Sequence, residues 1–288
     1  MKKRKCFEEL TIQDDFMFCK VLQNMDICKQ VLELVLQEEI PKIASISSQA
    51  TIANHPEFKN VRLDILAKDE KRNNFNVEMQ MVNNDKIPKR MRLYQAIIDA
   101  SIVDKGMPYA NMPNTVIIFF CMFDPIGDGL PIYTFKNTCQ ENKNINLGDG
   151  TVKIVINVKA YEKVKNPEMR GLLKYICEGV ATTSLTEAIE MNVAQIKKDT
   201  RLMEEYKSFY ATLQDERDEG IKEGEKRGIR KGMAQGMAQG MAQGMAQGMT
   251  QGMAQGMLTT ATRMKKANFD VSTIIEMTGL SREEIEKL

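Results

Sequence analysis

Residues 61–82 read VRLDILAKDEKRNNFNVEMQMV and contain two runs of alternating side chains on either side of a polar segment. This alternation predicts two β-strands, Val61 to Ala67 and Phe75 to Val82, because successive side chains of a strand point to opposite faces. The segment between them, residues 68–74, is rich in charged residues and asparagine, which favour turns. We therefore expect a β-hairpin here.

One face of this hairpin carries the residues that suggest chemistry. Asp64 lies on it in the first strand, and Glu78 and Gln80 lie on it in the second. If the hairpin closes symmetrically about Lys71, Asp64 lies opposite Glu78, with Cβ atoms about 4.5–5.5 Å apart. Two carboxylates at that distance repel each other, and one takes up a proton unless a cation lies between them.

A magnesium ion suits such a pair, because Mg²⁺ prefers carboxylate oxygens and keeps several of its waters. A metal-polarised water is a nucleophile for a phosphodiester, and the same ion offsets charge on the scissile phosphate. This chemistry alone does not select DNA over RNA. The alternative is a surface hairpin whose polar residues simply face solvent, and a one-residue slip in register would separate the two acids.

The segments around the hairpin predict a mixed α/β domain. Apolar residues recur at helical spacing before it, and a continuous apolar run after it is typical of a strand covered on both faces. In chain order we expect a helix at 11–39, a strand at 43–53, the hairpin, a helix at 86–105, a strand at 114–123 and a second hairpin that pairs 132–137 with 152–158.

Composition excludes several other classes of protein. The 288 residues carry a net charge of +1 and a single histidine, His55, which argues against a zinc site or a histidine-based triad. The six cysteines are scattered, as expected for reduced thiols in a cytoplasmic protein. No apolar run approaches the ~20 residues needed to cross a bilayer. The basic start, residues 1–5, is either a solvated tail or a phosphate-binding arm.

Several motifs resemble those of the recombination-promoting nucleases, also catalogued as PD-(D/E)XK nuclease family transposases. The matching segments are Asp14-Asp-Phe-Met-Phe18, Arg62-Leu-Asp-Ile-Leu-Ala67, Asn76-Val-Glu-Met-Gln80, Pro88-Lys-Arg-Met-Arg-Leu-Tyr94, Ile98-Asp99, Phe123-Asp-Pro-Ile-Gly127 and Gly129-Leu-Pro-Ile-Tyr-Thr-Phe135. The resemblance implies a restriction-endonuclease-like core and a metal-dependent DNA endonuclease linked to recombination or mobile elements. It implies Mg²⁺ as the cofactor, with Mn²⁺ as an alternative.

The resemblance also assigns residues to roles. Asp64 and Glu78 would hold the metal ion, and Asp15 would be the acid supplied by the first helix. Arg92 and Tyr94, on the helix after the hairpin, would line the DNA-binding cleft.

Gln80 stands where many relatives have lysine. A neutral amide can orient a water but brings no charge to the developing transition state. Two functions therefore stay open: an active endonuclease, or a catalytically weak or inactive protein of the same fold that binds DNA or serves assembly. A transposase in the strict sense lacks support, because no RNase-H-like spacing of acidic residues stands out.

The composition changes after the nuclease-like domain, which we assign to residues 1–180. A charged, helix-favouring segment at 181–231 precedes a Met-Ala-Gln-Gly repeat at 232–257. Glycine costs roughly 1 kcal/mol relative to alanine within a helix. A period of four also exceeds the helical 3.6, so the methionine stripe drifts by about 40° per repeat. We expect a spacer, flexible or helical, or a segment that forms homo-oligomers through Gly and Met.

Residues 258–288 predict a small helical tail of helix-turn-helix type. The step from Thr278 to Ser281 places a glycine at a helix end and a serine cap at the next helix start. The last helix is net acidic, whereas a helix that reads bases is basic or rich in amides. Packing or assembly is therefore the favoured role for this tail.

Overall fold

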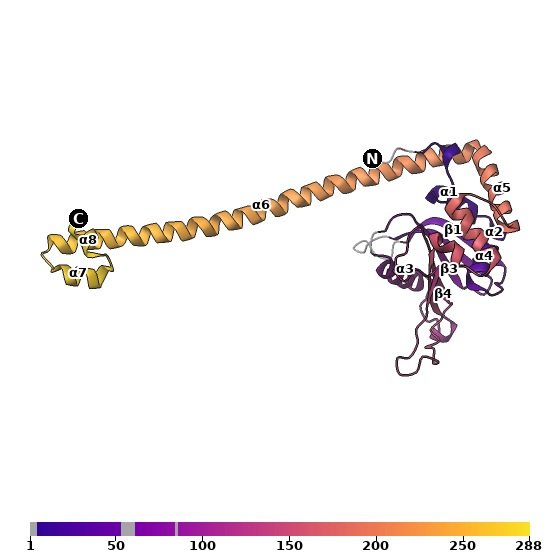
Figure 1. Ribbon diagram of the computed structural model, residues 1–288, viewed down its shortest axis with the longest axis horizontal. Helices are drawn as coiled ribbons and strands as arrows, with labels where there is room; N and C mark the ends of the chain where they lie inside the picture. The colour runs from indigo at the N-terminus through magenta and orange to yellow at the C-terminus, as the bar shows by residue number, and fades with distance from the viewer. Residues whose placement is uncertain (1–4, 53–60, 84–85) are drawn as a thin grey trace. The chain divides into compact units, whose positions relative to one another are not determined.

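The computed structural model describes residues 5–52, 61–83 and 86–288, with the chain drawn in Figure 1. His55 and most of the basic N-terminal cluster lie outside the described residues. The chain divides into two compact units, Met1–Ser208 and Phe209–Leu288.

The first unit is of the mixed α/β class that the sequence predicts. Its strands are β1 (Ile43–Ile52), β2 (Val61–Asp69), β3 (Asn74–Gln80), β4 (Thr115–Cys121), β5 (Ile132–Phe135) and β6 (Thr151–Asn157). Its helices are α1 (Asp15–Leu22), α2 (Met25–Leu36), α3 (Ile87–Ile102), α4 (Pro167–Glu178) and α5 (Ser184–Lys198), and three 3-10 helices lie at Phe7–Glu9, Tyr109–Asn111 and Val158–Lys163.

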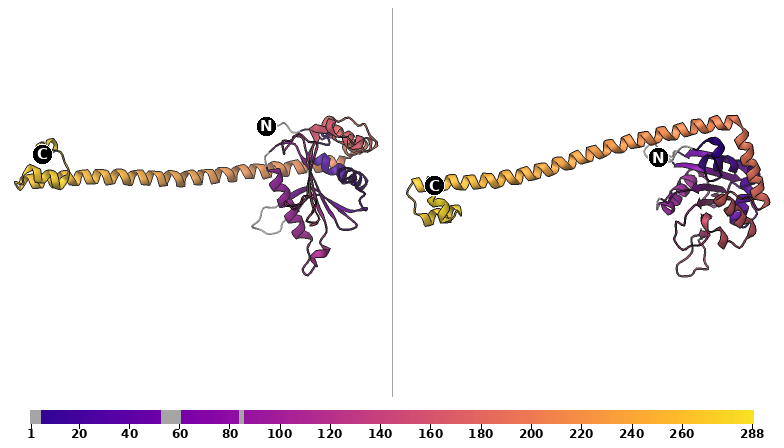
Figure 2. Two further views of the ribbon diagram at one scale, coloured as in Figure 1. Left: turned by 60° about the horizontal axis from the view of Figure 1, so that its bottom comes forward. Right: turned by 45° about the horizontal axis from the view of Figure 1, so that its top comes forward.

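The six strands form one sheet in the order β1-β2-β3-β4-β6-β5. Strands β1, β2 and β3 pair in antiparallel fashion, β3, β4 and β6 are parallel, and β5 returns antiparallel to β6. Every residue of β4 is buried, as the continuous apolar run predicts. Helix α3 covers one face of the sheet, and α1, α2, α4 and α5 lie on the other side (Figure 2).

The first predicted helix is wrong in one respect, because residues 11–39 form two helices rather than one. The break falls at Asn24, whose side chain accepts hydrogen bonds from the backbone N–H groups of Asp26 and Ile27 at 3.0 and 3.2 Å. Asparagine competes with the backbone inside a helix and favours the N-cap, so it starts α2 instead of continuing α1. The predicted strand 75–82 likewise ends earlier, at Gln80.

Helix α3 is amphipathic and is held on the sheet by its apolar stripe. A proline lies in its first turn, where the missing N–H costs no helical hydrogen bond. The buried side chains recur every three or four residues and pack on β2, β4 and β6 in one cluster. The stripe consists of Ile87, Met91, Tyr94, Ile98 and Ile102.

The first compact unit extends past residue 180, where the sequence places the end of the nuclease-like domain. Helix α5 buries Leu185, Ile189, Val193 and Ile196, so it packs within this unit although its outer face is charged. Helix α6 (Thr200–Lys266) begins in the same unit.

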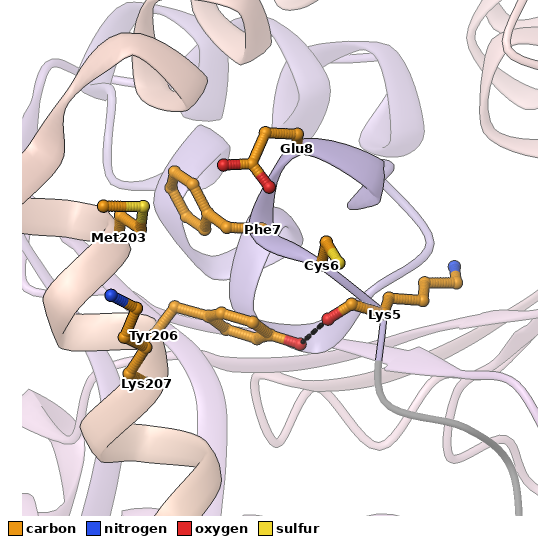
Figure 3. A pocket seen from close by; sticks show the side chains of 7 residues that line it. All are labelled: Lys5, Cys6, Phe7, Glu8, Met203, Tyr206 and Lys207. Atoms are coloured by element: carbon orange, nitrogen blue, oxygen red, sulfur yellow. Dashed lines mark hydrogen bonds between the residues drawn. The ribbon is translucent and has the colours of Figure 1, made fainter.

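Tyr206, in the first turns of α6, fixes that helix start to the N-terminal segment. Its ring lies 5.8 Å from the ring of Phe7 and 5.3 Å from that of Phe16, measured between centroids. Its hydroxyl donates a 3.0 Å hydrogen bond to the carbonyl oxygen of Lys5 (Figure 3). The ring is 5% exposed, so residues up to Ser208 complete the core of this unit.

The second unit contains the rest of α6 together with α7 (Val271–Thr278) and α8 (Arg282–Glu286). Gly279 ends α7 with φ of 70°, and Ser281 forms a capping box with Glu284 at the start of α8. Ala261, Ile274 and Ile285 form the buried centre of this helical tail. The Met-Ala-Gln-Gly repeat lies within α6. No helix in the described part of the chain has the length and apolar character needed to span a bilayer.

Candidate functional site

The β2–β3 hairpin has the register that symmetric closure about residue 71 predicts. Its backbone pairs are Ile65 with Val77, Leu66 with Asn76, Ala67 with Phe75 and Lys68 with Asn74. The next step of this register places Asp64 opposite Glu78. The Asp64 N–H donates a 2.9 Å hydrogen bond to Glu78 Oε1, and the Met79 N–H donates a 3.1 Å hydrogen bond to Asp64 Oδ2. The two acids are therefore neighbours on one face of the sheet.

Glu78 is the most deeply enclosed acid of this face, with 2% of its surface exposed. Besides the Asp64 N–H, its Oε1 accepts a 2.9 Å hydrogen bond from Asn76 Nδ2. Burial, followed by the nearby Asp64 carboxylate, raises the pKa of Glu78 from 4.5 to about 8. The burial of Glu78 and Asn76 excludes the alternative of a surface hairpin whose polar face lies in open solvent.

Asp15, the first residue of α1, acts electrostatically on Asp64 of strand β2. Burial, and then the charge of Asp15, raises the pKa of Asp64 to about 6. Asp15 as a whole residue is exposed. Desolvation of its carboxyl group nevertheless raises the pKa of Asp15, and the charge of Asp14 raises this pKa further. Arg62 and Arg90 lower the pKa of both Asp15 and Asp64. The structure thus brings Asp15 within electrostatic range of Asp64.

Arg90, on the first turns of α3, is the residue of this site that sequence reasoning missed. Its Nη1 donates a 2.5 Å hydrogen bond to Gln80 Oε1, and its Nη2 donates one of 2.8 Å to the Tyr94 hydroxyl. Nη2 also lies 3.5 Å from Glu78 Oε2, a long ion pair. Arg90 and Tyr94 are four residues apart, so both lie on the side of α3 that faces the sheet. The four-residue spacing of Arg90 and Tyr94 was the sequence signal that could have identified Arg90.

Tyr94 therefore lies beside Arg90 and is buried in the core, whereas Arg92 is not brought to the acidic pair. Arg92 is exposed on α3. Two residues correspond to about 200° of rotation around a helix, so a side chain at 92 points away from the face that 90 and 94 share. The cation that α3 places beside the acids is Arg90 instead.

A family comparison agrees with this geometry. Residues 13–137 match the profile of the PD-(D/E)XK nuclease family transposase. The matched segment is similar to the PD-(D/E)XK nuclease family transposases. It includes Asp15, Asp64, Glu78 and Gln80, and the resemblance identified from the sequence motifs is confirmed. Comparison with curated proteins and with solved structures gave no match.

The acids of this PD-(D/E)XK domain fit a divalent cation as a pair rather than as a larger cluster. Within residues 5–52, 61–83 and 86–288, no three His, Cys, Asp or Glu side chains are gathered to hold a metal ion. Asp64 and Glu78 are nevertheless adjacent and mutually repulsive, and Glu78 forms a long ion pair of 3.5 Å with Arg90. Mg²⁺ is often bound through one or two carboxylates, with waters and substrate phosphates completing the shell.

One cavity of the first unit lies apart from this acidic pair. The cavity in Figure 3 has a volume of about 370 Å³ and lies between the N-terminal segment and α6. Its lining consists of Lys5, Cys6, Phe7, Glu8, Met203, Tyr206 and Lys207. None of these belongs to the acidic face of the hairpin, so this cavity is separate from the acidic pair.

Proposed function

We propose that this protein is a metal-dependent DNA endonuclease that hydrolyses phosphodiester bonds in DNA recombination or in the movement of mobile elements. The observation that carries the proposal is the adjacent pair of Asp64 and Glu78, whose pKa values are both raised by burial and by neighbouring acids. A divalent cation between the two carboxylates would offset their repulsion and favour their charged forms. A PD-(D/E)XK nuclease family domain is the setting in which that pair serves DNA cleavage.

In this proposal Asp64 and Glu78 hold Mg²⁺, or Mn²⁺ in its place, and Asp15 adds negative charge from α1. The ion, when bound, supplies a polarised water and offsets charge on the scissile phosphate. Gln80 follows Glu78 by two residues on the same face and orients a water or phosphate through its amide. Tyr94 holds the Arg90 guanidinium by a hydrogen bond and so fixes the helix side of the cleft.

The second candidate is a catalytically weak or inactive PD-(D/E)XK-fold protein that binds DNA or serves assembly. Two observations favour it. Gln80 is neutral, and Glu78 Oε1 already accepts hydrogen bonds from Asp64 N and Asn76 Nδ2. A metal ion would therefore have to share Glu78 with these donors.

We further propose a division of labour along the chain. The first compact unit, which ends at Ser208, would carry the nuclease function. The rest of the charged segment up to residue 231, the repeat at 232–257 and the tail at 258–288 would act as spacer and assembly region, through which the protein forms homo-oligomers. All six cysteines are free thiols, which accords with a reducing compartment such as the cytoplasm. DNA is the proposed macromolecular partner.

Incubation of the purified protein with supercoiled plasmid tests the proposal. We expect nicking or linearisation with Mg²⁺ or Mn²⁺, none in EDTA, and none by an Asp64→Ala variant whose circular dichroism matches the wild type. A parallel RNA substrate shows whether the sugar is selected. Cleavage that persists in EDTA and in Asp64→Ala would remove Asp64 from the mechanism, and DNA binding without any cleavage would support the second candidate.

A further inference from the structure

The acidic face of strand β3 carries a neutral residue at position 80. Gln80 is the residue two positions after Glu78 on the same face of β3, and its side chain is neutral. The structure places a guanidinium against it, since Arg90 Nη1 lies 2.5 Å from Gln80 Oε1. A cation is thus present at the end of the Gln80 side chain, although it comes from α3.

The Arg90 guanidinium is held in position from several sides. Its Cζ atom lies 5.3 Å from the centroid of the Tyr94 ring and 5.2 Å from that of Phe119, so it is stacked against two aromatic rings. The Tyr94 hydroxyl accepts a hydrogen bond from Nη2 at 2.8 Å. These contacts orient the planar group before any substrate binds, which reduces the entropy lost on binding.

The same guanidinium is not fully neutralised by its acidic neighbour. Its closest approach to Glu78 is 3.5 Å, longer than the 2.7–2.9 Å typical of a charge-assisted hydrogen bond. The Arg90 side chain is 28% exposed, whereas that of Glu78 is 3% exposed. The Arg90 side chain therefore remains partly accessible to an anion from solvent.

We propose that Arg90 is the cation that α3 contributes to this site and that it binds the scissile phosphate in place of a lysine at position 80. The inference rests on the proposed nuclease function and assigns to it a phosphate-binding residue. A guanidinium stays charged and presents its N–H donors in a fork that matches two phosphate oxygens. Arg90 moves no proton; it stabilises the negative charge that develops on the phosphate oxygens.

A purely structural role for Arg90 would lead to a different experimental result. If Arg90 only neutralised buried Glu78, a cation elsewhere at the site would not replace it in catalysis. If Arg90 supplies charge to the phosphate, a lysine introduced at position 80 would restore that charge from the strand. The pair of positions 80 and 90 can therefore be tested by moving the charge between them.

The experiment compares four proteins in the plasmid assay: wild type, Arg90→Gln, Gln80→Lys and the double variant. We expect Arg90→Gln to lose about 100-fold in cleavage, as when one preorganised donor is removed. Gln80→Lys alone also loses activity, because its ammonium lies next to the Arg90 guanidinium. The double variant recovers to within about tenfold of wild type, the range by which supporting contacts at such sites alter activity. A double variant no better than Arg90→Gln would overturn the proposal.

Two binding measurements separate charge from structure. We expect Arg90→Gln, without DNA, to bind Mg²⁺ at least as tightly as wild type by calorimetry, because a competing cation beside Glu78 is removed. Its affinity for a non-cleavable phosphorothioate duplex should fall and should return in the double variant. Loss of Mg²⁺ binding together with activity would show that Arg90 is structural and would overturn the proposal. Lys89→Gln, an exposed neighbour on α3, is the matched control and should behave as wild type.

The same variants distinguish a failure of the proposed nuclease function from a failure of the role assigned to Arg90. If wild type does not cleave DNA, the proposed function fails, and the duplex affinities still decide whether Arg90 binds phosphate. If wild type cleaves and Asp64→Ala does not, but the charge cannot be moved from position 90 to position 80, only the role of Arg90 fails.

Discussion

Methionine has opposite environments in the two units of this protein. Met79, on strand β3, is 5% exposed, whereas Met241, in the repeat of α6, is 73% exposed. In β3 the neighbouring residues alternate between an apolar face and a polar face, and both faces are covered by the rest of the unit. In α6 the methionine recurs every fourth residue on a helix whose side chains contact little else in their own unit.

The comparison shows how far a local pattern determines structure. The hairpin residues obtain their properties from distant parts of the chain, such as Arg90 of α3 and Asp15 of α1. The repeat residues share the same local environment at every period, so removing one of them changes little. Substitutions should therefore have large effects in the hairpin and small ones in the repeat.

The largest expected difference concerns catalysis. Glu78→Ala should lower metal-dependent plasmid cleavage by more than ~100-fold, the upper range for residues that only support a metal ligand. Met241→Ala should leave the cleavage rate within about twofold of wild type, a change of less than 1 kcal/mol in the barrier. The rates of both variants are measured at saturating Mg²⁺. A Met241→Ala variant as impaired as Glu78→Ala would break the distinction between the units.

The next effect concerns the boundary of the first unit. A chain that ends at Ser208 should retain the stability of this unit, whereas one that ends at Asp199 lacks Tyr206 and its aromatic contacts. Loss of a buried aromatic side chain costs about 3–5 kcal/mol, so the shorter chain should unfold at markedly lower urea concentration. Equal urea midpoints for the two chains would show that the first turns of α6 do not stabilise the first unit.

The stability of the metal-free protein should depend on pH through the acidic pair. The pKa values of Glu78, about 8, and Asp64, about 6, exceed the ordinary values of 4.5 and 3.8, so the folded state binds more protons than the unfolded state between these limits. The free energy of unfolding therefore falls as pH rises from about 4 to 8, and all of this stabilisation is present below the ordinary values. Urea titrations in EDTA at several pH values measure the slope.

Glu78→Gln is the control for this titration, and its slope between pH 6 and 8 should be smaller than that of wild type. Over the same range the affinity of wild type for Mg²⁺ should rise, because the ligands must lose their protons before they bind the ion. Mg²⁺ affinity that falls as pH rises would contradict the assignment of these two acids.

The smallest expected effect concerns glycine. A Cβ at Gly240 would meet nothing within 4 Å, so Gly240→Ala should stabilise α6 by about 0.5–1 kcal/mol. Gly150 is the matched contrast, because its φ is +70° and a Cβ there would lie 2.2 Å from Asn114 Oδ1. Gly150→Ala should therefore destabilise the first unit. Circular dichroism on heating reports both changes, and a Gly240→Ala protein with less helix would show that the repeat needs its glycines.

Much of the first unit follows from the sequence because its patterns are local. Alternation predicts β2 and β3, the apolar run predicts β4, and turn residues fix the hairpin register about residue 71. That register in turn places Asp64 beside Glu78. The single long helix expected at 11–39 failed because one asparagine cap outweighs the continuity of the apolar stripe.

The candidate site was predictable only in part. The acids and Tyr94 lie in recognisable motifs, but the choice between Arg90 and Arg92 depends on the rotation of α3 about its axis. That rotation is set by the burial of the α3 stripe against the sheet, a tertiary contact. The sequence resemblance placed the arginine two residues away, on the opposite side of the helix.

By itself, the sequence determined the strands, the register of the hairpin, the paired acids and the period-four repeat, because these depend on the alternation and spacing of neighbouring residues. The tertiary structure alone decided that the polar face of the hairpin is covered, that Arg90 meets Gln80 and Glu78, and that the first unit continues to Ser208. The physical reason is that burial and charge compensation depend on which surfaces meet in space. In this protein, those surfaces come from parts of the chain separated by many residues.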